Sequence, residues 1–283
     1  MIGKGLINIR NVISRDYSTD EVFDLLRMIN GLGMIVYYMT VVIPHFNLYY
    51  SKSGLVAPEA FSFYPKSWVF LFNGNEILLT GLLIFLLALI LCYTIGLYAK
   101  WALVIFLPIH LGFHTANPFI IHEPQQLSNL LLILTLLFPI ENKWALKTKS
   151  DIFPALKERE KKMILFSLGC YLSLYYFFAG FKKIPDSSWL NGEAVHQLLS
   201  WPYLSRDNFF NEFFKNPKLS PLLSYFTIFF ELSFFLVAIT KYRKLLIPIG
   251  VMFHLIIGLS LDIGLFFWSM ISWYPVLLIQ LKK

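Results

Sequence analysis

The sequence predicts an all-α membrane protein, a polytopic bundle of about eight spanning helices. Of its 283 residues, 57% are hydrophobic and only 14% are charged, whereas roughly a quarter of the residues in soluble domains are charged. Apolar runs of 18 or more residues recur along the chain, and such runs are typical of membrane-spanning helices. No soluble domain of useful size remains once these runs are removed.

The first 24 residues precede the first span and mix charged with apolar side chains. They have no continuous apolar core and no small-residue cleavage site, so they do not form a secretory signal. We predict that residues 1–24 are a cytoplasmic segment lying on the membrane surface. A single transmembrane domain then covers residues 25–283. Ser18 and Glu21 have the spacing of a capping box for the first span.

Eight apolar stretches are the predicted spans: 25–43, 77–95, 99–116, 127–140, 163–181, 221–240, 244–261 and 263–281. The fourth is short for a full span. The last two share one apolar stretch that is interrupted at Asp262 and Gly264. Either a tight hairpin or a re-entrant segment fits this interruption.

The distribution of basic residues predicts that both termini are cytoplasmic, because cytoplasmic loops are enriched in Lys and Arg. Residues 141–163 hold seven basic side chains, 241–244 read KYRK, and loop 110–126 has no Lys or Arg. Further basic residues flank the start of the first span: Lys4, Arg10, Arg15 and Arg27. The predicted outer loops are therefore 44–76, 110–126 and 182–220. Anchoring beside anionic lipids accounts for most of the net charge of +7, so nucleic acid is not an expected partner.

Two adjacent lysines follow an aromatic run in YYFFAGFKKIPDSSWLNGEAV, residues 175–195. If the run is helical, Lys183 shares a face with Tyr176 and Gly180, and small residues favour close helix contact. Lys182 lies about 100° around the helix and is expected to reach the surface. Burial favours a neutral amine, so Lys183 could act as a base or nucleophile. An equally good interpretation is that both lysines anchor the helix at the interface.

Two ionisable residues lie inside predicted spans: Glu231 in FFELSFF and His254 in GVMFHLIIG. Counting outward from the turn near Tyr242 places them at about the same depth in a helical hairpin, since each residue rises about 1.5 Å. We predict that they lie close enough to pair. The pair could be functional, or it could be a hydrogen bond that only holds two helices together.

Other polar residues are predicted near the outer face. His122, Gln126 and Asn129 lie at the entrance to the fourth span and could bind a ligand or a neighbouring helix. Their spacing matches no zinc signature, so no metal is predicted. Trp189 and Asn191 belong to a turn before a short helix, which could close over Lys183 as a lid.

The run at 175–195 resembles the segment of vitamin K-dependent γ-carboxylases in which Ala-Gly-x-Lys-Lys precedes a tryptophan and a glycine. LLILTLLFPIENKW, Glu231, the KYRK turn, His254 and the WYP at 273–275 resemble further parts of that family. The wider group is the horizontally transferred transmembrane (HTTM) domain family. Its bacterial members include a membrane protein of the sporulation-delaying peptide toxin system, and WLNGEA at 189–194 resembles that type.

The resemblance implies an integral protein of the bacterial cytoplasmic membrane, with the lipid bilayer and a peptide or protein as partners. It implies that Lys183 is a base toward a reduced naphthoquinone, to which oxygen adds to give an epoxide. The strong base formed removes a γ-proton from glutamate, and carbon dioxide adds. Candidate catalytic residues are Lys183 and His254. Candidate binding residues are Lys182, Glu231, Trp189, Asn191, His122, Gln126 and Asn129.

The carboxylases follow their membrane domain with a large extracytoplasmic domain, whereas this sequence ends at Lys283. A partner protein could supply the missing surface. The alternative function is a non-enzymatic binding or assembly subunit of an export or peptide-toxin system.

Overall fold

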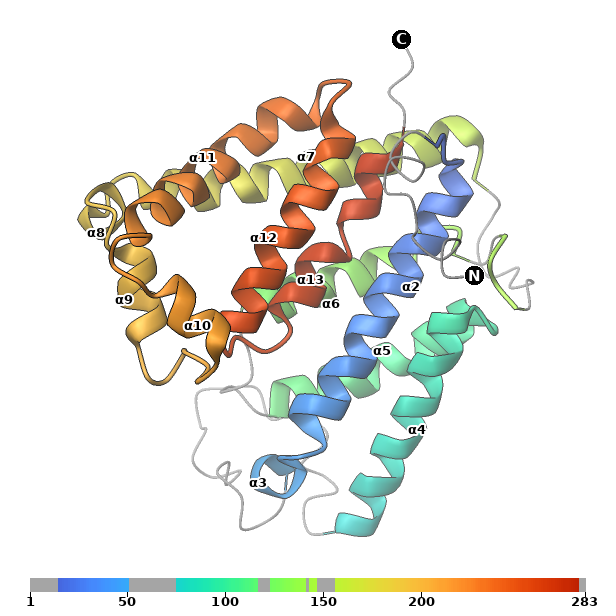
Figure 1. Ribbon diagram of the computed structural model, residues 1–283. Helices are drawn as coiled ribbons and strands as arrows, with labels where there is room; N and C mark the ends of the chain where they lie inside the picture. The colour runs from blue at the N-terminus through green and yellow to red at the C-terminus, as the bar shows by residue number, and fades with distance from the viewer. Residues whose placement is uncertain (1–14, 51–74, 117–122, 141–142, 147–155, 280–283) are drawn as a thin grey trace, which may run out of the picture. The chain divides into compact units, whose positions relative to one another are not determined.

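The computed structural model describes residues 15–50, 75–116, 123–140, 143–146 and 156–279 (Figure 1). These residues form helices and turns, with an isolated β-bridge between Ser205 and Leu261, so the all-α prediction is confirmed. The helices are α2 (Thr19–Tyr37), η1 (a π-helical turn, Tyr38–Val42), α3 (Phe46–Tyr50), α4 (Glu76–Ile95), α5 (Ala99–Ala116), α6 (Glu123–Thr135), α7 (Glu158–Lys183), α8 (Ser187–Leu190), α9 (Ala194–Ser200), α10 (Phe209–Phe214), α11 (Ser220–Ala238), η5 (Arg243–Leu245), α12 (Leu246–Ser260), α13 (Phe266–Ile271) and η6 (Tyr274–Leu278).

Five helical stretches of the described residues are long and apolar enough to cross a membrane: Thr19–Val42, Glu76–Ile95, Glu158–Lys183, Ser220–Ala238 and Arg243–Ser260. The sequence predicts three more spans, which coincide with α5, with α6 and with the segment 266–278. At 13 residues, α6 is about 20 Å long, which is short of the roughly 30 Å hydrocarbon core. The number of spans and the side of the termini therefore stay predictions.

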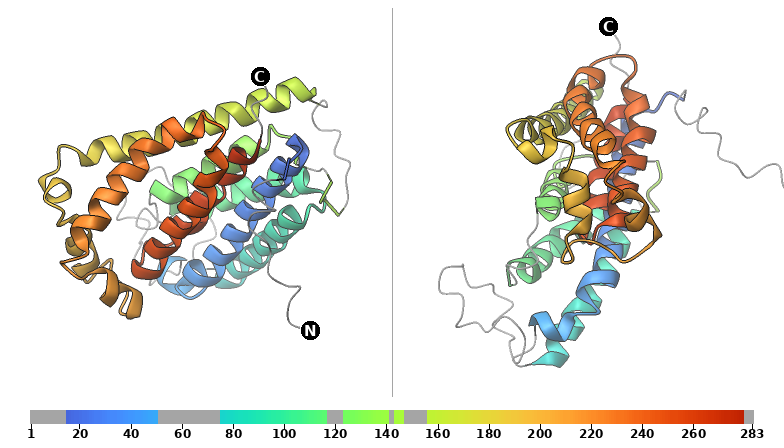
Figure 2. Two further views of the ribbon diagram at one scale, coloured as in Figure 1. Left: turned by 45° about the horizontal axis from the view of Figure 1, so that its top comes forward. Right: turned by 60° about the vertical axis from the view of Figure 1, so that its left-hand side comes forward.

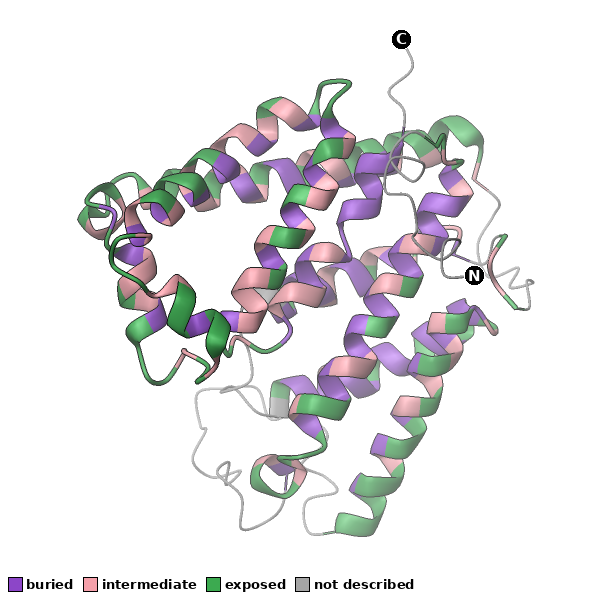
Figure 3. Cartoon of the chain, viewed as in Figure 1, coloured by how far each residue is buried: buried purple, intermediate pink, exposed green. Residues whose placement is uncertain are grey.

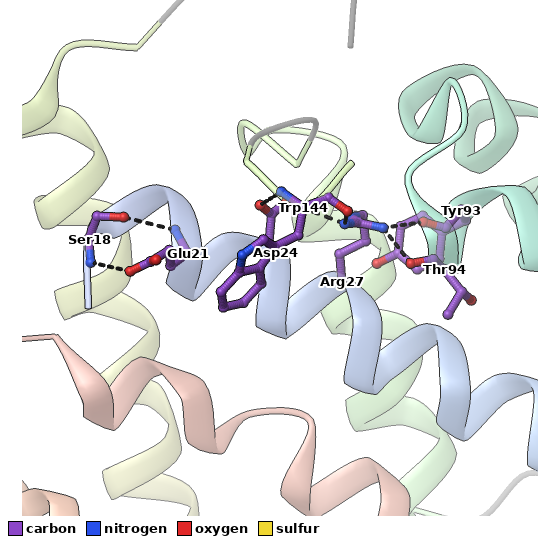
Figure 4. Close-up of polar contacts among 7 residues, drawn as sticks. All are labelled: Ser18, Glu21, Asp24, Arg27, Tyr93, Thr94 and Trp144. Carbon is purple, nitrogen blue, oxygen red and sulfur yellow. Dashed lines mark hydrogen bonds and ion pairs between the residues drawn. The ribbon is translucent and has the colours of Figure 1, made fainter. Parts of the chain in front are cut away.

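The first helix begins directly after the capping box that the sequence predicts, six residues before the predicted span at 25. Ser18 and Glu21 form the expected capping box, in which the Glu21 N–H donates to Ser18 Oγ at 3.2 Å and the Ser18 N–H donates to Glu21 Oε2 at 3.1 Å (Figure 4). Because this box starts α2 at Thr19, the predicted boundary at residue 24 falls inside a helix. Residues 1–14 of the predicted surface segment lie outside the described residues.

The last predicted span, 263–281, is not one continuous helix. It is divided into α13 and η6, with Ser272 and Trp273 between them. Pro275 stands in the first turn of η6, and proline cannot donate the backbone hydrogen bond that a continuing helix needs. The interruption predicted at Asp262 and Gly264 is confirmed, because α12 ends at Ser260 and α13 begins at Phe266. The break at Ser272 and Trp273 is a second one, which the sequence does not predict.

The helices divide into two compact units, which are described here one at a time. The first unit comprises residues 1–22, 157–263 and 273–283, and the second comprises 23–156 and 264–272. In the first unit, α7 and α11 pack along each other, and the short helices α8, α9 and α10 connect their ends (Figure 1 and Figure 2). η5 and α12 follow α11, and η6 packs against α7.

In the second unit, α4 packs against α5 and α6 packs against α13. Its core includes a fully buried charged pair on α2, Asp24 and Arg27. The sequence places Arg27 among the basic flanks of the first span, and the structure shows that its side chain is buried. Its guanidinium donates to the Tyr93 carbonyl at 3.0 Å and to the Thr94 carbonyl, while Asp24 accepts the Trp144 N–H at 2.9 Å (Figure 4).

The physical reason for the burial of Arg27 is the end of α4. The last carbonyls of a helix have no partner within the helix, so they need donors from elsewhere. A guanidinium supplies several donors at once, and a cation is favourable at the negative end of the helix dipole. Arg27 therefore joins α2 to the end of α4 and to the loop at residue 144.

Exposed residues recur along the long helices (Figure 3), and many of them are large and apolar. Ile77 on α4 is 84% exposed, and Phe229 on α11 is 70% exposed. Soluble proteins rarely expose contiguous apolar surface of this kind. Together with the length of these helices, the exposure indicates contact with lipid rather than water.

Candidate functional site

Lys183 and Lys182 lie in different environments at the end of α7. Lys182 is exposed, whereas the Lys183 side chain is only 19% exposed and turns toward α11. Tyr176 and Gly180 are buried on the same face, as their spacing in the sequence predicts. Because an α-helix has 3.6 residues per turn, the two adjacent lysines point about 100° apart around α7.

Gly180 allows α11 to approach this face of α7 closely. A Cβ atom at Gly180 would lie 3.0 Å from the Cβ of Glu231 and 3.0 Å from the Cγ of Leu232. These separations are shorter than ordinary van der Waals contact, so a larger residue would push the helices apart. The absence of a side chain at Gly180 therefore brings the Glu231 carboxylate within reach of Lys183.

Lys183 and Glu231 form an ion pair between α7 and α11. The Lys183 Nζ lies 2.9 Å from Glu231 Oε1 and 2.7 Å from Oε2, and it also donates to the Ala179 carbonyl at 3.2 Å. The Glu231 side chain is only 10% exposed. Both carboxylate oxygens therefore face the Lys183 amine.

The Trp189 ring lies beside the Lys183 amine. The Lys183 Nζ lies 5.0 Å from the centroid of the Trp189 ring, which is a cation–π distance. Trp189 belongs to α8, whose first turn is capped by Asp186. Hydrogen bonds from the Ser188 hydroxyl and backbone N–H lower the pKa of the Asp186 carboxyl below its ordinary value.

The turn after Trp189 is fixed to the start of α11. Asn191 ends α8, and Gly192 has a φ of +77°, a conformation that glycine adopts without strain. The Ser220 hydroxyl donates to the Gly192 carbonyl at 2.6 Å and accepts the His196 N–H at 3.0 Å. The sequence predicts α9 as a lid over Lys183, but it is Trp189 of α8 that contacts the amine.

A second polar cluster lies deeper on the same face of α7. The Tyr176 hydroxyl is 2.5 Å from His254 Nε2 and 2.5 Å from the Tyr274 hydroxyl. All three residues are buried, and the Tyr176 ring stacks on Phe234 with centroids 4.0 Å apart. The sequence interpretation includes Tyr176 and the WYP motif but assigns neither tyrosine a role. The pattern that could have identified them is a tyrosine within an apolar run, because a buried tyrosine hydroxyl needs a hydrogen-bond partner.

Glu231 and His254 lie at similar depth, as the count along the hairpin predicts. Their preceding residues, Phe230 and Phe253, are in ring contact with centroids 5.0 Å apart. The predicted direct pair is nevertheless not confirmed. Glu231 forms its ion pair with Lys183, and His254 contacts the Tyr176 hydroxyl. Depth alone does not determine which neighbour a helical side chain faces.

The remaining candidate residues belong to the second unit or lie outside the described residues. Asn129 lies between two histidines of α5, with its Oδ1 2.8 Å from His110 Nε2 and its Nδ2 3.2 Å from His114 Nδ1. Gln126 is exposed. His122 lies outside the described residues, so its predicted role stays a prediction.

The fold and the apolar helices define an integral membrane protein with a polytopic helical domain. The family model of the HTTM domain matches residues 20–280. The chain therefore belongs to the HTTM family. No curated protein and no solved structure matches it.

Proposed function

We propose that this protein uses Lys183 as a base at a membrane site that faces outward. In this proposal, it modifies or matures a peptide or protein partner with the help of a reduced naphthoquinone. The observation that carries the proposal is the ion pair, in which a mostly buried amine is held by a mostly buried carboxylate at 2.7 Å. Ionisable residues within membrane-spanning helices are rare and usually functional.

The pair provides a route to a neutral amine. Moving one proton from Lys183 Nζ to Glu231 Oε2 removes two opposite charges at once. The proton travels within an existing hydrogen bond of 2.7 Å. The neutral amine then has a lone pair that accepts a proton from a bound acid. Glu231 holds the first proton and keeps the amine in position.

The Trp189 ring beside the amine fits contact with a flat apolar cofactor, since it lies 5.0 Å from Nζ. On another face of α7, the Phe177 and Phe181 rings stack with centroids 6.1 Å apart. Phe181 is 55% exposed, so part of this surface is open to a ligand from the membrane. When bound, a reduced naphthoquinone supplies the reductant: with oxygen, carbon dioxide and a C–H bond of the partner it yields the quinone epoxide, water and a carboxylated partner.

His254 acts in this proposal as a positioning residue. Its Nε2 atom lies 2.5 Å from the Tyr176 hydroxyl, on the face of α7 that also carries Lys183. The Tyr176 hydroxyl also contacts the Tyr274 hydroxyl, so His254 links α7, α12 and η6 through this tyrosine. Replacement of His254 is therefore expected to act through the helix positions.

The test is a search for the oxidised quinone. Purified protein in lipid is supplied with a reduced naphthoquinone, oxygen, bicarbonate and a glutamate-rich peptide, and the quinone products are resolved by mass spectrometry. Epoxide is expected from the wild type and from the exposed-lysine control Lys182→Met, but not from Lys183→Met. Equal epoxide from Lys183→Met would contradict the assignment of the base.

The second candidate function is a non-enzymatic binding or assembly subunit. It is favoured by exposed aromatic residues between α9 and α11: Tyr203 is 87% exposed, Phe209 is 75% exposed and Phe213 is 52% exposed. Such residues are enriched where proteins bind one another. This function predicts that folded wild type gives no epoxide, that a partner co-purifies with it, and that Phe209→Ser but not Lys183→Met releases the partner.

A further inference from the structure

An apolar groove of the first unit ends at a buried arginine. The groove runs between α7 and α11, and residues of η6 line it as well; its lining includes Phe166, Gly169, Ile239, Val276 and Arg243. The hollow itself is small, about 30 Å³, and open on one side. A chain-like ligand would therefore enter it with only a short part of its length and lie with the rest over the apolar surface beside it.

Arg243 is the unusual member of this lining. It is only 7% exposed, and its Nη2 atom is buried without a hydrogen-bond partner. A buried guanidinium is costly unless its donors are paired. The fork of a guanidinium matches the two free oxygens of a phosphate group, to which it donates parallel hydrogen bonds.

We propose that the groove binds an anionic phospholipid. Its acyl chain lies along α7 and α11, and its phosphate accepts hydrogen bonds from Arg243. The apolar lining selects the chain, and the unpaired buried donor selects the charged head. This inference is independent of the proposed chemistry at Lys183.

The charges beside the groove are complementary to such a lipid. Arg243 belongs to the KYRK turn, in which Lys241 is exposed and Lys244 donates to the Arg15 carbonyl at 2.8 Å. The positive-inside pattern predicts that this turn faces the cytoplasm, where the membrane surface is rich in anionic lipids. Phe166 is 49% exposed and Ile239 is 56% exposed, so the sides of the groove are apolar surface that a second chain could cover.

The test compares lipids on the full chain. Native mass spectrometry in detergent measures binding of dioleoyl-phosphatidylglycerol, of dioleoyl-phosphatidylcholine and of oleate. Wild type is expected to prefer phosphatidylglycerol, and Arg243→Gln is expected to weaken its binding about tenfold, as expected for loss of a charge-assisted hydrogen bond. Lys241→Gln, which removes a charge from the same turn but outside the groove, is expected to keep the preference.

A second variant tests the chain-binding part of the groove. A Cβ atom at Gly169 would lie 3.9 Å from the nearest atom, Val276 Cγ2, so Gly169→Leu fits the backbone and fills the groove. It is expected to weaken phosphatidylglycerol and phosphatidylcholine alike.

Three results would overturn the inference. They are equal binding of the two phospholipids by the wild type, unchanged binding by Arg243→Gln, and stronger binding of oleate than of phosphatidylglycerol. The melting temperature without lipid separates binding from folding. Because Arg243→Gln removes a buried charge whose Nη2 donor has no partner, this temperature is expected to stay the same or rise. A fall would show that Arg243 is structural and would also overturn the inference.

Discussion

Breaking the ion pair between Lys183 and Glu231 is expected to destabilise the protein, whereas removing both charges is not. Removing one member of a fully buried pair costs about 3–5 kcal/mol. Here the side chains are 19% and 10% exposed, so solvent reduces the cost. We therefore expect Lys183→Met and Glu231→Gln each to lower the free energy of unfolding by about 2 kcal/mol.

The double variant Lys183→Met/Glu231→Leu leaves no uncompensated charge. Its free energy of unfolding is expected to lie within about 1 kcal/mol of the wild-type value, because apolar replacements of a buried pair are often nearly neutral. Glu231→Leu, the second single variant of the double-mutant cycle, is also expected to cost about 2 kcal/mol. The cycle then gives a coupling of about 3–5 kcal/mol between the two positions.

Unfolding in mixed micelles with increasing SDS measures each member of the cycle. Lys182→Met is the matched control, since Lys182 is exposed one residue away, and it is expected to change the free energy of unfolding by less than about 0.5 kcal/mol. A coupling below about 0.5 kcal/mol would refute the ion pair as described.

Three further predictions concern other parts of the chain. Gly180→Leu is expected to cost about 1–3 kcal/mol of unfolding free energy by overpacking, whereas Gly81→Leu, where a Cβ meets nothing within 4 Å, is not. Arg27→Leu is expected to cost about 3 kcal/mol in the same SDS titration, because it removes the donor to two helix-end carbonyls and the ion-pair partner of the buried Asp24 carboxylate. The Asp186 carboxyl has a lowered pKa, so its contribution to stability is present at neutral pH and is lost as the pH falls through that pKa. Ser188→Ala is expected to raise the pKa toward its ordinary value in a titration followed by NMR.

The fold class follows from composition, but the number of spans does not. Long apolar runs determine that helices form, and the capping box at Ser18 marks where the first one begins. The last apolar stretch shows the limit. Its hydropathy is continuous, but Pro275 and the packing around it divide the stretch into α13 and η6.

Part of the candidate site was predictable from helical period alone. The spacing of Tyr176, Gly180 and Lys183 places them on one face and sends Lys182 to the surface. The partner of Lys183 was not predictable in this way, because Glu231 lies 48 residues further along the chain. Whether the Glu231 side chain faces Lys183 depends on how α11 is rotated about its axis relative to α7.

Arg27 shows a second limit of sequence interpretation. A lone arginine at the start of an apolar run has the pattern of a cytoplasmic flank, and nothing in its neighbours distinguishes it from one. Its burial depends on the end of α4, some 66 residues later, which supplies carbonyls without helical partners.

The most direct test of the central claim exchanges the two charges. Lys183→Glu/Glu231→Lys keeps an ion pair between α7 and α11 but moves the amine to the other helix and away from its place on α7. We predict that this variant unfolds at nearly the SDS concentration of the wild type and forms no quinone epoxide. Wild-type epoxide formation by the exchanged variant would contradict the account, because the position of the amine at residue 183 would then not matter.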